Sequence, residues 1–407
     1  RWTNFYLAYQ GKDDVEPQRR YGAFLRSVLQ RAAPELYAPR TKRRAAGRIR
    51  VGFLSHFFFN CTAGRYFSAW ATQLDRTRFE TVVYYTNEWV ADDTRAIAAA
   101  VDRFRHLPGR PLATLAQQVI ADQLDILVYP ELGMHPETFA LASLRLAPVQ
   151  CAGWGHPNTT GHPEIDWFVS CEAMEPPDAA AHYSERLALL PGLGTRYARP
   201  RTDSQRTRAD FGLPDGRTLY LLPQSLFKIH PDNDELLARV LERDPAGIAV
   251  LFASNHANIT NAFAARLAPV FERHGMDLHE RTCFLGALAH HEYLRVNQLC
   301  DVMLDTMHWS GGNTSLDALA MGLPLVTLPG GLMRGRQSQA MLRIVGAQDL
   351  VASSVEEYLG IAQRLGGDAA ERTRISGRIR DGLGNLFERD EPIRALEAFL
   401  ERAAREP

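Results

Sequence analysis

A turn of small polar residues, SGGNT at 310–314, separates an apolar segment from a helix-like segment in the second half of the sequence. The apolar segment CDVMLD (300–305) predicts a buried strand, and SLDALAMG (315–322) has helical periodicity. The first N–H groups of a helix have no acceptor within the helix, and a phosphate can accept their hydrogen bonds. Thr314 adds a hydroxyl, and Asp317 could accept hydrogen bonds from a ribose diol. These residue types favour a nucleotide as ligand.

A lysine follows another apolar segment. Lys228 lies in the loop after TLYLLP (218–223), where the carboxyl end of a strand is expected. A lysine there could neutralise a diphosphate leaving group, which is the role of a metal ion in other enzymes. Each feature also has a simpler interpretation. Asn313 or Thr314 could be an ordinary helix N-cap, and Lys228 could be a solvated surface charge.

The elements that must position these residues are short β-rich segments that alternate with helical ones. Strands are expected at 50–55, 81–86, 125–130, 149–155, 166–171, 218–223, 246–254, 281–286, 300–305 and 324–329. This pattern is typical of α/β proteins with parallel sheets covered on both faces. We assign an N-terminal helical segment (1–45), a first lobe (46–200), a charged, Pro- and Gly-rich linker (201–216) and a second lobe with a C-terminal helix (217–407). Two doubly wound domains in tandem are expected to face a central cleft.

The amino-acid composition excludes several classes of protein. The 407 residues are 45 % hydrophobic and 23 % charged, with a formal net charge of −1, so no overall field attracts nucleic acid or anionic lipid. Five scattered cysteines lack the spacing of a zinc site and favour a reducing cytoplasm. No apolar run is long enough for a membrane span. The sequence starts at Arg1, so upstream sequence is expected.

Several motifs in one order resemble the catalytic region of glycosyltransferase family 41, the family of O-linked N-acetylglucosamine transferases and SPINDLY proteins. The motifs are RLAPVQCAGWGHPNTTG (145–161), IDWFVSCEAMEP (165–176), HYSERLALLPG (182–192), SLFKI (225–229), CDVMLDT (300–306), GGNTSLDAL (311–319) and GLPLVTLPG (322–330). The resemblance implies a GT-B fold of two Rossmann-like lobes, a nucleotide-sugar donor, no metal, and inversion at the anomeric carbon. It also implies tetratricopeptide repeats upstream.

The resemblance assigns a donor site to the second lobe. Lys228 matches the lysine on the donor phosphates, and Asp317 matches the acidic residue on the ribose. Asn313 and Thr314 match paired threonines at the helix start, whereas Gly312 stands where the animal enzyme has a histidine.

The remaining donor positions differ more in residue type. Leu288 matches the backbone that binds the uracil base, and Tyr293 the ring that packs on it. His290 replaces a phosphate-facing lysine, and Ser225 replaces a glutamine near the phosphates.

The acceptor side departs further from the family pattern. Phe57 and Cys61 stand where the animal enzyme has an aspartate and a histidine, and Gln10 stands at an earlier histidine. The family groups proposed to take the acceptor proton are therefore absent. His56 and His135 remain as candidate bases, although either could be a loop or core histidine without that role.

Other residues have weaker assignments. His156, Thr159 and Thr160 could contact the sugar or acceptor, or could simply form a turn. Cys61 could be a nucleophile, but no sequence neighbour lowers the pKa of its thiol. The amphipathic segment 15–37 is expected to pack on the first lobe instead of binding a membrane.

These observations predict a cytoplasmic, metal-independent, inverting transferase without a cofactor. It would move N-acetylglucosamine or glucose from UDP to a Ser or Thr hydroxyl of a protein or peptide. Two alternatives stay open: an asparagine glucosyltransferase of the same family, and a UDP-sugar-binding module that has lost transfer activity. Nucleic acid and membrane are not expected partners.

Overall fold

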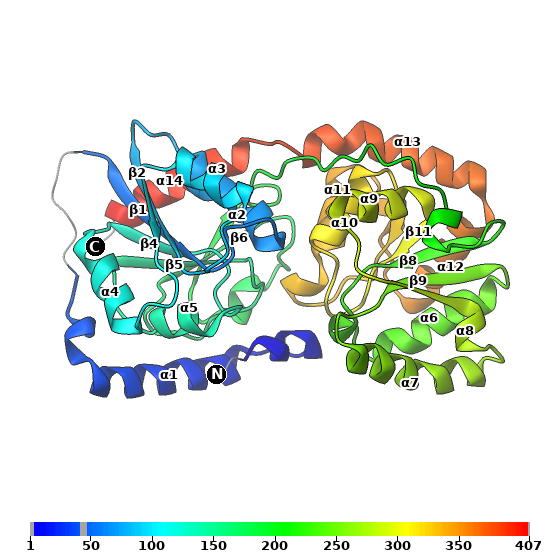
Figure 1. The fold of residues 1–407 in the computed structure, drawn as a ribbon, viewed down its shortest axis with the longest axis horizontal. Helices are drawn as coiled ribbons and strands as arrows, with labels where there is room; N and C mark the ends of the chain where they lie inside the picture. The colour runs from blue at the N-terminus through cyan, green and yellow to red at the C-terminus, as the bar shows by residue number, and fades with distance from the viewer. Residues whose placement is uncertain (1–3, 41–46, 406–407) are drawn as a thin grey trace. The chain divides into compact units, whose positions relative to one another are not determined.

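The computed structural model describes residues 4–40 and 47–405, which divide into two compact units (Figure 1). The first unit contains the residues up to Ala8, Lys12–Ala198 and the segment from Glu388 onward. The second contains Tyr9–Gly11 and Arg199–Phe387.

The first unit is built on a parallel sheet of seven strands. The strands are β1 (Ile49–Ser55), β2 (Phe79–Tyr85), β3 (Arg103–His106), β4 (Ile126–Tyr129), β5 (Val149–Gly153), β6 (Trp167–Cys171) and β7 (Arg186–Leu190). Their order is β3-β2-β1-β4-β5-β6-β7, and every pair is parallel. The central strands are apolar on both faces because helices cover both sides.

The described residues of this unit form six α-helices. They are α1 (Val15–Ala32), α2 (Thr62–Thr72), α3 (Asp92–Ala100), α4 (Leu112–Ala121), α5 (Pro136–Leu141) and α14 (Glu391–Arg405). Short 3-10 helices are η2 (Pro34–Tyr37) and η3 (Ala179–His182), and η1 (Phe5–Gln10) begins in this unit, whereas its last residues, Tyr9 and Gln10, belong to the second unit. Figure 1 shows α2, α3 and α14 on one side of the sheet and α4 and α5 on the other.

Helix α1 packs on the first unit, as expected for the amphipathic segment. A Cβ on Gly22 would lie 2.1 Å from the carbonyl oxygen of Gly161, so the two backbones are in close contact. Arg26 forms an ion pair with Glu164 at 2.7 Å. None of the described helices is both long and apolar enough to span a membrane.

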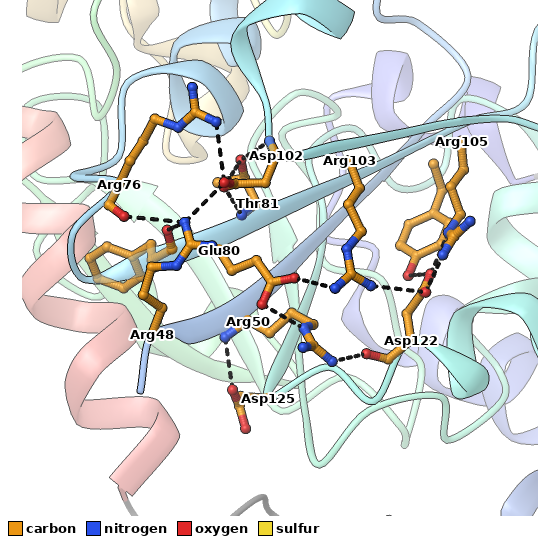
Figure 2. Close-up of polar contacts among 12 residues, drawn as sticks. Arg48, Arg50, Arg76, Glu80, Thr81, Asp102, Arg103, Arg105, Asp122 and Asp125 are labelled. Carbon is orange, nitrogen blue, oxygen red and sulfur yellow. Dashed lines mark hydrogen bonds and ion pairs between the residues drawn. The ribbon is translucent and has the colours of Figure 1, made fainter. Parts of the chain in front are cut away.

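A network of charged side chains ties the first strands together (Figure 2). Arg50 on β1 and Arg103 on β3 both bind Glu80 on β2, at 3.0 and 2.7 Å. Asp122, beside the start of β4, accepts hydrogen bonds from Tyr84 and Arg105. These charges are paired with one another within the unit, and they link β1, β2 and β3 at the edge of the sheet.

The second unit contains a parallel sheet of five strands, β8 (Thr218–Leu222), β9 (Gly247–Phe252), β10 (Thr282–Leu285), β11 (Val302–Leu304) and β12 (Leu325–Val326). Their order is β10-β9-β8-β11-β12. The helices are α6 (Asp232–Arg243), α7 (Ala257–Arg273), α8 (Leu278–Arg281), α9 (His290–Leu299), α10 (Asn313–Ala320), α11 (Gln337–Ile344), α12 (Val355–Gly367) and α13 (Ala369–Leu386). Short 3-10 helices are η4 (Ala209–Phe211), η5 (Leu226–Lys228), η6 (Met333–Gly335) and η7 (Gln348–Leu350).

All ten expected strands form, within a few residues of their expected ends. Two strands were not predicted, β3 and β7, which are the edge strands of the first sheet. Edge strands expose polar residues, so the sequence RFRH of β3 carries little apolar signal.

The units do not follow the predicted boundaries at two places. Residues 201–216, expected as a linker, belong to the second unit, where Arg208 donates to the carbonyl oxygen of Leu299 at 2.8 Å. The C-terminal helix α14, expected within the second lobe, belongs to the first unit. Its apolar face decides this placement, since Phe399 packs against Trp167 with ring centroids 5.4 Å apart.

Candidate active site

The strand order of the second sheet reverses between β8 and β11. From β8 the chain adds β9 and β10 on one side, and then β11 and β12 on the other. Ligands of doubly wound folds bind outside the carboxyl ends of the strands at such a reversal. Lys228 follows β8 in η5, and the turn 310–314 follows β11. The two segments singled out in the sequence therefore lie at the expected binding position.

Lys228 is surrounded by aromatic rings. Its Nζ lies 5.2 Å from the ring centroid of Trp309, 5.7 Å from that of Tyr9 and 5.8 Å from that of Phe227. Burial lowers the pKa of the ammonium group to about 8. Within residues 4–40 and 47–405 no carboxylate forms an ion pair with it. The site thus holds a desolvated cation without a protein counter-ion, which suits an anionic ligand.

Asp305 holds the turn after β11 in place. Its buried carboxylate accepts hydrogen bonds from the Gly311 N–H and the Ser310 hydroxyl, both at 2.7 Å. The Gly311 N–H is therefore not available to a phosphate. The hydroxyl oxygen of Thr314, at the start of α10, is buried and has no hydrogen-bond partner among the described residues. An unsatisfied hydroxyl at a helix N-terminus is the place where a phosphate oxygen would bind.

Asp317 is completely buried one turn into α10. Its Oδ2 accepts a hydrogen bond from Asn313 Nδ2 at 2.6 Å and lies 3.2 Å from His290 Nε2. His290 in turn stacks nearly parallel to Tyr293, with ring centroids 6.2 Å apart. The structure brings these four predicted residues together, but a ribose could reach Asp317 only if His290 or Asn313 moved aside.

The other predicted donor residues are on loops at the same edge of the sheet. Leu288 is partly buried in the loop after β10, and Ser225 is exposed immediately before η5. Gly312 is the residue before α10, with φ −86° and ψ −94°.

The first sheet reverses its strand order between β1 and β4. His56 follows β1, and His135 follows β4 as the residue before α5. Their rings stack with centroids 3.7 Å apart and planes 5° from parallel. The two candidate bases, 79 positions apart in the sequence, are therefore neighbours.

The hydrogen bonds of His56 define its protonation state. Nδ1 lies 3.0 Å from Thr86 Oγ1, and Nε2 lies 3.1 Å from Asn87 Nδ2. Asn87 Oδ1 accepts a hydrogen bond from the Trp89 N–H, which turns the amide nitrogen toward His56. An amide N–H can only donate, so Nε2 of His56 is the acceptor and Nδ1 carries the proton. Burial also lowers the pKa of His56.

Glu131 contacts the backbone of His56 and was not found from the sequence. It is 2 % exposed, and Oε1 accepts a hydrogen bond from the His56 N–H at 3.3 Å. Its Oε2 has no partner among the described residues, and burial raises the pKa of Glu131 to about 8. The sequence feature that could have identified Glu131 is its position two residues after an apolar strand, in YPEL.

Two predicted catalytic residues do not gain support. The Cys61 thiol donates to the carbonyl oxygen of Phe57 at 3.3 Å, and burial raises the pKa of the thiol, so a reactive thiolate is disfavoured. Gln10 is exposed at the end of η1 and belongs to the second unit with Tyr9 and Gly11.

The loop residues His156, Thr159 and Thr160 serve the fold of the first unit. Thr159 Oγ1 donates to Glu185 Oε2 at 2.7 Å, and the Thr160 hydroxyl donates to the other oxygen of Glu185. His156 is 3 % exposed and stacks on Phe5. Because the two hydroxyls already bind a buried carboxylate, the turn-forming interpretation is favoured over sugar contact.

The comparison with known protein families matches the chain in two parts, which correspond to the two units. The profile of Glycosyl transferase family 41 matches residues 25–198 and 193–387. The chain belongs to glycosyltransferase family 41. The two sheets, each with a reversal of strand order, are the two lobes of the GT-B fold.

Curated relatives of this family 41 chain include the probable UDP-N-acetylglucosamine–peptide N-acetylglucosaminyltransferases SPINDLY of Arabidopsis thaliana and of Oryza sativa. The Arabidopsis protein is 26 % identical over 339 residues, covering 82 % of this chain and 36 % of the relative. The rice protein is 27 % identical over 342 residues, covering 81 % and 36 %. The chain thus spans about a third of the length of these relatives.

Solved structures that are similar to this chain include two glycosyltransferases of known name. A lysine-to-methionine mutant of the Thermobaculum terrenum O-GlcNAc transferase has a TM-score of 0.82 and 28 % identity, covering 98 % of this chain and 76 % of that one. Sucrose-phosphate synthase of Thermosynechococcus elongatus has a TM-score of 0.54 and 14 % identity, covering 87 % and 98 %, and shares the fold alone.

Proposed function

We propose that this family 41 chain transfers a sugar from a UDP-sugar to a Ser or Thr hydroxyl of a protein, with inversion and without a metal ion. The second unit binds the donor, and the first unit supplies the groups for the acceptor. The named SPINDLY relatives and the O-GlcNAc transferase structure support N-acetylglucosamine as the sugar. Glucose is the second candidate for the sugar.

The observation that carries the proposal is the environment of Lys228. Among the described residues, a desolvated ammonium without a counter-ion and the unpartnered hydroxyl of Thr314 both lie in segments that follow the strands of the reversal. As the bond between the anomeric carbon and the phosphate oxygen breaks, negative charge grows on UDP. Lys228 stabilises that charge, so no metal ion is needed for this purpose.

The acceptor step requires a base on the opposite face of the sugar. We assign this role to His56, because Nδ1–H donates to Thr86 and leaves the lone pair of Nε2 aimed at Asn87. The acceptor hydroxyl would replace the Asn87 amide at Nε2. Its oxygen forms the new bond to the anomeric carbon, its proton passes to Nε2, and UDP departs with the bonding electron pair.

Two alternatives make different predictions. An asparagine glucosyltransferase would form an N-linked product, which resists the alkaline elimination that releases sugars from Ser and Thr. A UDP-sugar-binding module would bind UDP but form no product. The absence of the family's acceptor-side aspartate and histidine at Phe57 and Cys61 is the observation that favours this second alternative.

The test is an intact-mass assay of acceptor proteins incubated with UDP-N-acetylglucosamine or UDP-glucose in EDTA. We expect a mass increase of one sugar with wild-type protein, and a rate about a hundredfold lower with Lys228→Ala. Lys12→Ala, at an exposed lysine of the first unit, is the matched control and should retain the wild-type rate. Transfer that requires added magnesium would contradict the metal-free proposal. Unchanged transfer by Lys228→Ala would overturn the assigned donor site.

A further inference from the structure

A second group of side chains at the strand reversal of the second unit takes no part in the proposed transfer. His230 and Asp232 lie at the start of α6, and His308 lies in the loop after β11. One donor atom of each of the three residues lies within 4.8 Å of the other two. We propose that His230, Asp232 and His308 form a binding site for a divalent transition-metal ion such as Zn²⁺.

The donor distances suit such an ion. A tetrahedral ion with bonds of about 2.0–2.1 Å holds its donor atoms about 3.3 Å apart. His230 Nδ1 and Asp232 Oδ1 are already 3.4 Å apart, and the ion would displace the hydrogen bond of 3.2 Å that Nδ1 accepts from the Asp232 N–H. His308 Nε2 lies 2.7 Å from Asp232 Oδ2, so a side-chain rotation that opens this contact by about 0.6 Å gives these two atoms the separation of two ligands. Asp232 is 55 % exposed, which leaves a path for the ion and a free coordination position.

The backbone around His308 favours this arrangement. His308 has φ +70°, in the left-handed region that non-glycine residues seldom adopt. Gly11 packs against its ring, and a Cβ at Gly11 would lie 2.6 Å from Nδ1. Nδ1 is therefore covered, while Nε2 is directed at Asp232. The strained residue thus presents the nitrogen that a metal site needs.

Neighbouring hydrogen bonds hold the two ligand-bearing segments together. Asn233 Oδ1 accepts from the Met307 N–H at 2.8 Å, and Asn233 Nδ2 donates to the His230 carbonyl oxygen at 3.0 Å. The ligands are thus positioned before an ion binds. Two imidazoles and one carboxylate favour Zn²⁺, Co²⁺ or Ni²⁺ over Mg²⁺, which prefers oxygen ligands.

One other group among the described residues has three candidate ligands, His56, His135 and Glu137. It fits an ion less well. The His56 and His135 rings are stacked 5° from parallel, so their lone pairs do not converge on one point. The geometry therefore selects the group at His308.

The test is calorimetric titration of the wild-type protein with ZnCl₂ in the absence of nucleotide. We expect one site, with affinity at least about tenfold weaker in His308→Ala and in Asp232→Asn. Asp232→Asn retains the side-chain volume and guards against misfolding of the alanine variant. His274→Ala is the matched control, since His274 is also paired with carboxylates, at 2.8 Å from Glu235 and 3.2 Å from Glu242.

Zinc binding that is equal in all four proteins, or lost only in His274→Ala, would overturn the proposal. A second readout is thermal unfolding. Zn²⁺ should raise the melting temperature of the wild type and of His274→Ala, but not of His308→Ala, and equimolar Mg²⁺ should have no effect. UDP titrations in EDTA test the donor site separately, so failure of the metal site would leave the proposed function unaffected.

Discussion

Lys228 is the only lysine after residue 42, in a sequence whose other cations beyond that point are arginines and histidines. An arginine stays charged at every accessible pH, whereas burial lowers the pKa of Lys228 to about 8. The proposed donor site therefore uses a lysine, whose charge can change near pH 8, where an arginine would stay charged.

UDP affinity is accordingly expected to depend on pH. As pH rises from 7 to 9, Lys228 loses its proton in the free protein, and binding must restore it. The dissociation constant should increase above pH 8, approaching about tenfold per pH unit. Calorimetry at several pH values measures this. In Lys228→Arg the cation persists, so the same pH range should leave affinity nearly constant; parallel curves for both proteins would contradict the assignment.

Glu131 permits a stability prediction at the residue scale. Its pKa is about 8 in the folded protein, against about 4.3 in an unfolded chain, so folding favours the protonated form. The protonated Glu131 side chain therefore contributes to the free energy of unfolding in full below about pH 4, and this contribution is lost as the pH rises toward 8. Glu131→Gln cannot ionise. Its free energy of unfolding should therefore increase relative to wild type by up to about 1.4 kcal/mol per pH unit between pH 5 and 8.

Urea denaturation at pH 5, 6, 7 and 8 measures this difference. A constant offset between the two proteins would mean that Glu131 is already ionised in the folded state.

At the scale of elements, the turn before α10 depends on the absence of a side chain at Gly311. A Cβ there would lie 2.3 Å from Ser315 Oγ and 2.7 Å from Thr314 Oγ1. Ser315 is itself bound to Ser338 at 2.7 Å, so it cannot move freely. The substitution would displace the start of the helix proposed to bind phosphate.

Gly311→Ala should therefore weaken UDP binding by about tenfold or more, since overpacking typically costs about 1–3 kcal/mol. Gly331→Ala is the control, because no atom lies within 4 Å of a Cβ at that position. Isothermal titration of both variants checks the prediction. Equal affinities would show that the turn does not bind the nucleotide.

At the scale of the whole molecule, the C-terminal helix α14 completes the first unit. Leu396 is 0 % exposed in this helix, and the buried Glu397 accepts a hydrogen bond from the Asp75 N–H at 2.7 Å. A helix more than 300 residues after Asp75 in the sequence thus contributes to the core of the unit that contains β1 to β7. The donor residues all belong to the other unit.

Leu396→Ala should lower the free energy of unfolding of the first unit by about 2–5 kcal/mol. UDP affinity should not change, because the donor residues lie in the second unit. Val28→Ala, at a side chain that is 46 % exposed on α1, should have little effect on stability. Urea unfolding measures the stability of both variants, and UDP titration measures their affinity for the nucleotide. A loss of UDP affinity as large as the loss of stability would contradict the division of roles.

The sequence alone determined the α/β class and the ten main strands, and it placed Lys228 and the turn 310–314 after the carboxyl ends of strands, where the structure has them. These are local properties, because a buried strand needs a run of apolar residues and a strand-to-helix turn needs small polar ones. Edge strand β3, RFRH, lacks that run and so was missed, whereas β7, RLALL, has an apolar run that was not assigned to a strand.

Only the tertiary structure decided which loops meet. Strand order places His56 beside His135 and Glu131. Folding also pairs the hydroxyls of Thr159 and Thr160 with the carboxylate of Glu185. In the second unit, His308 contacts Asp232. Such contacts join residues 20 or more positions apart. They depend on packing and on the burial of charge, which local periodicity does not encode.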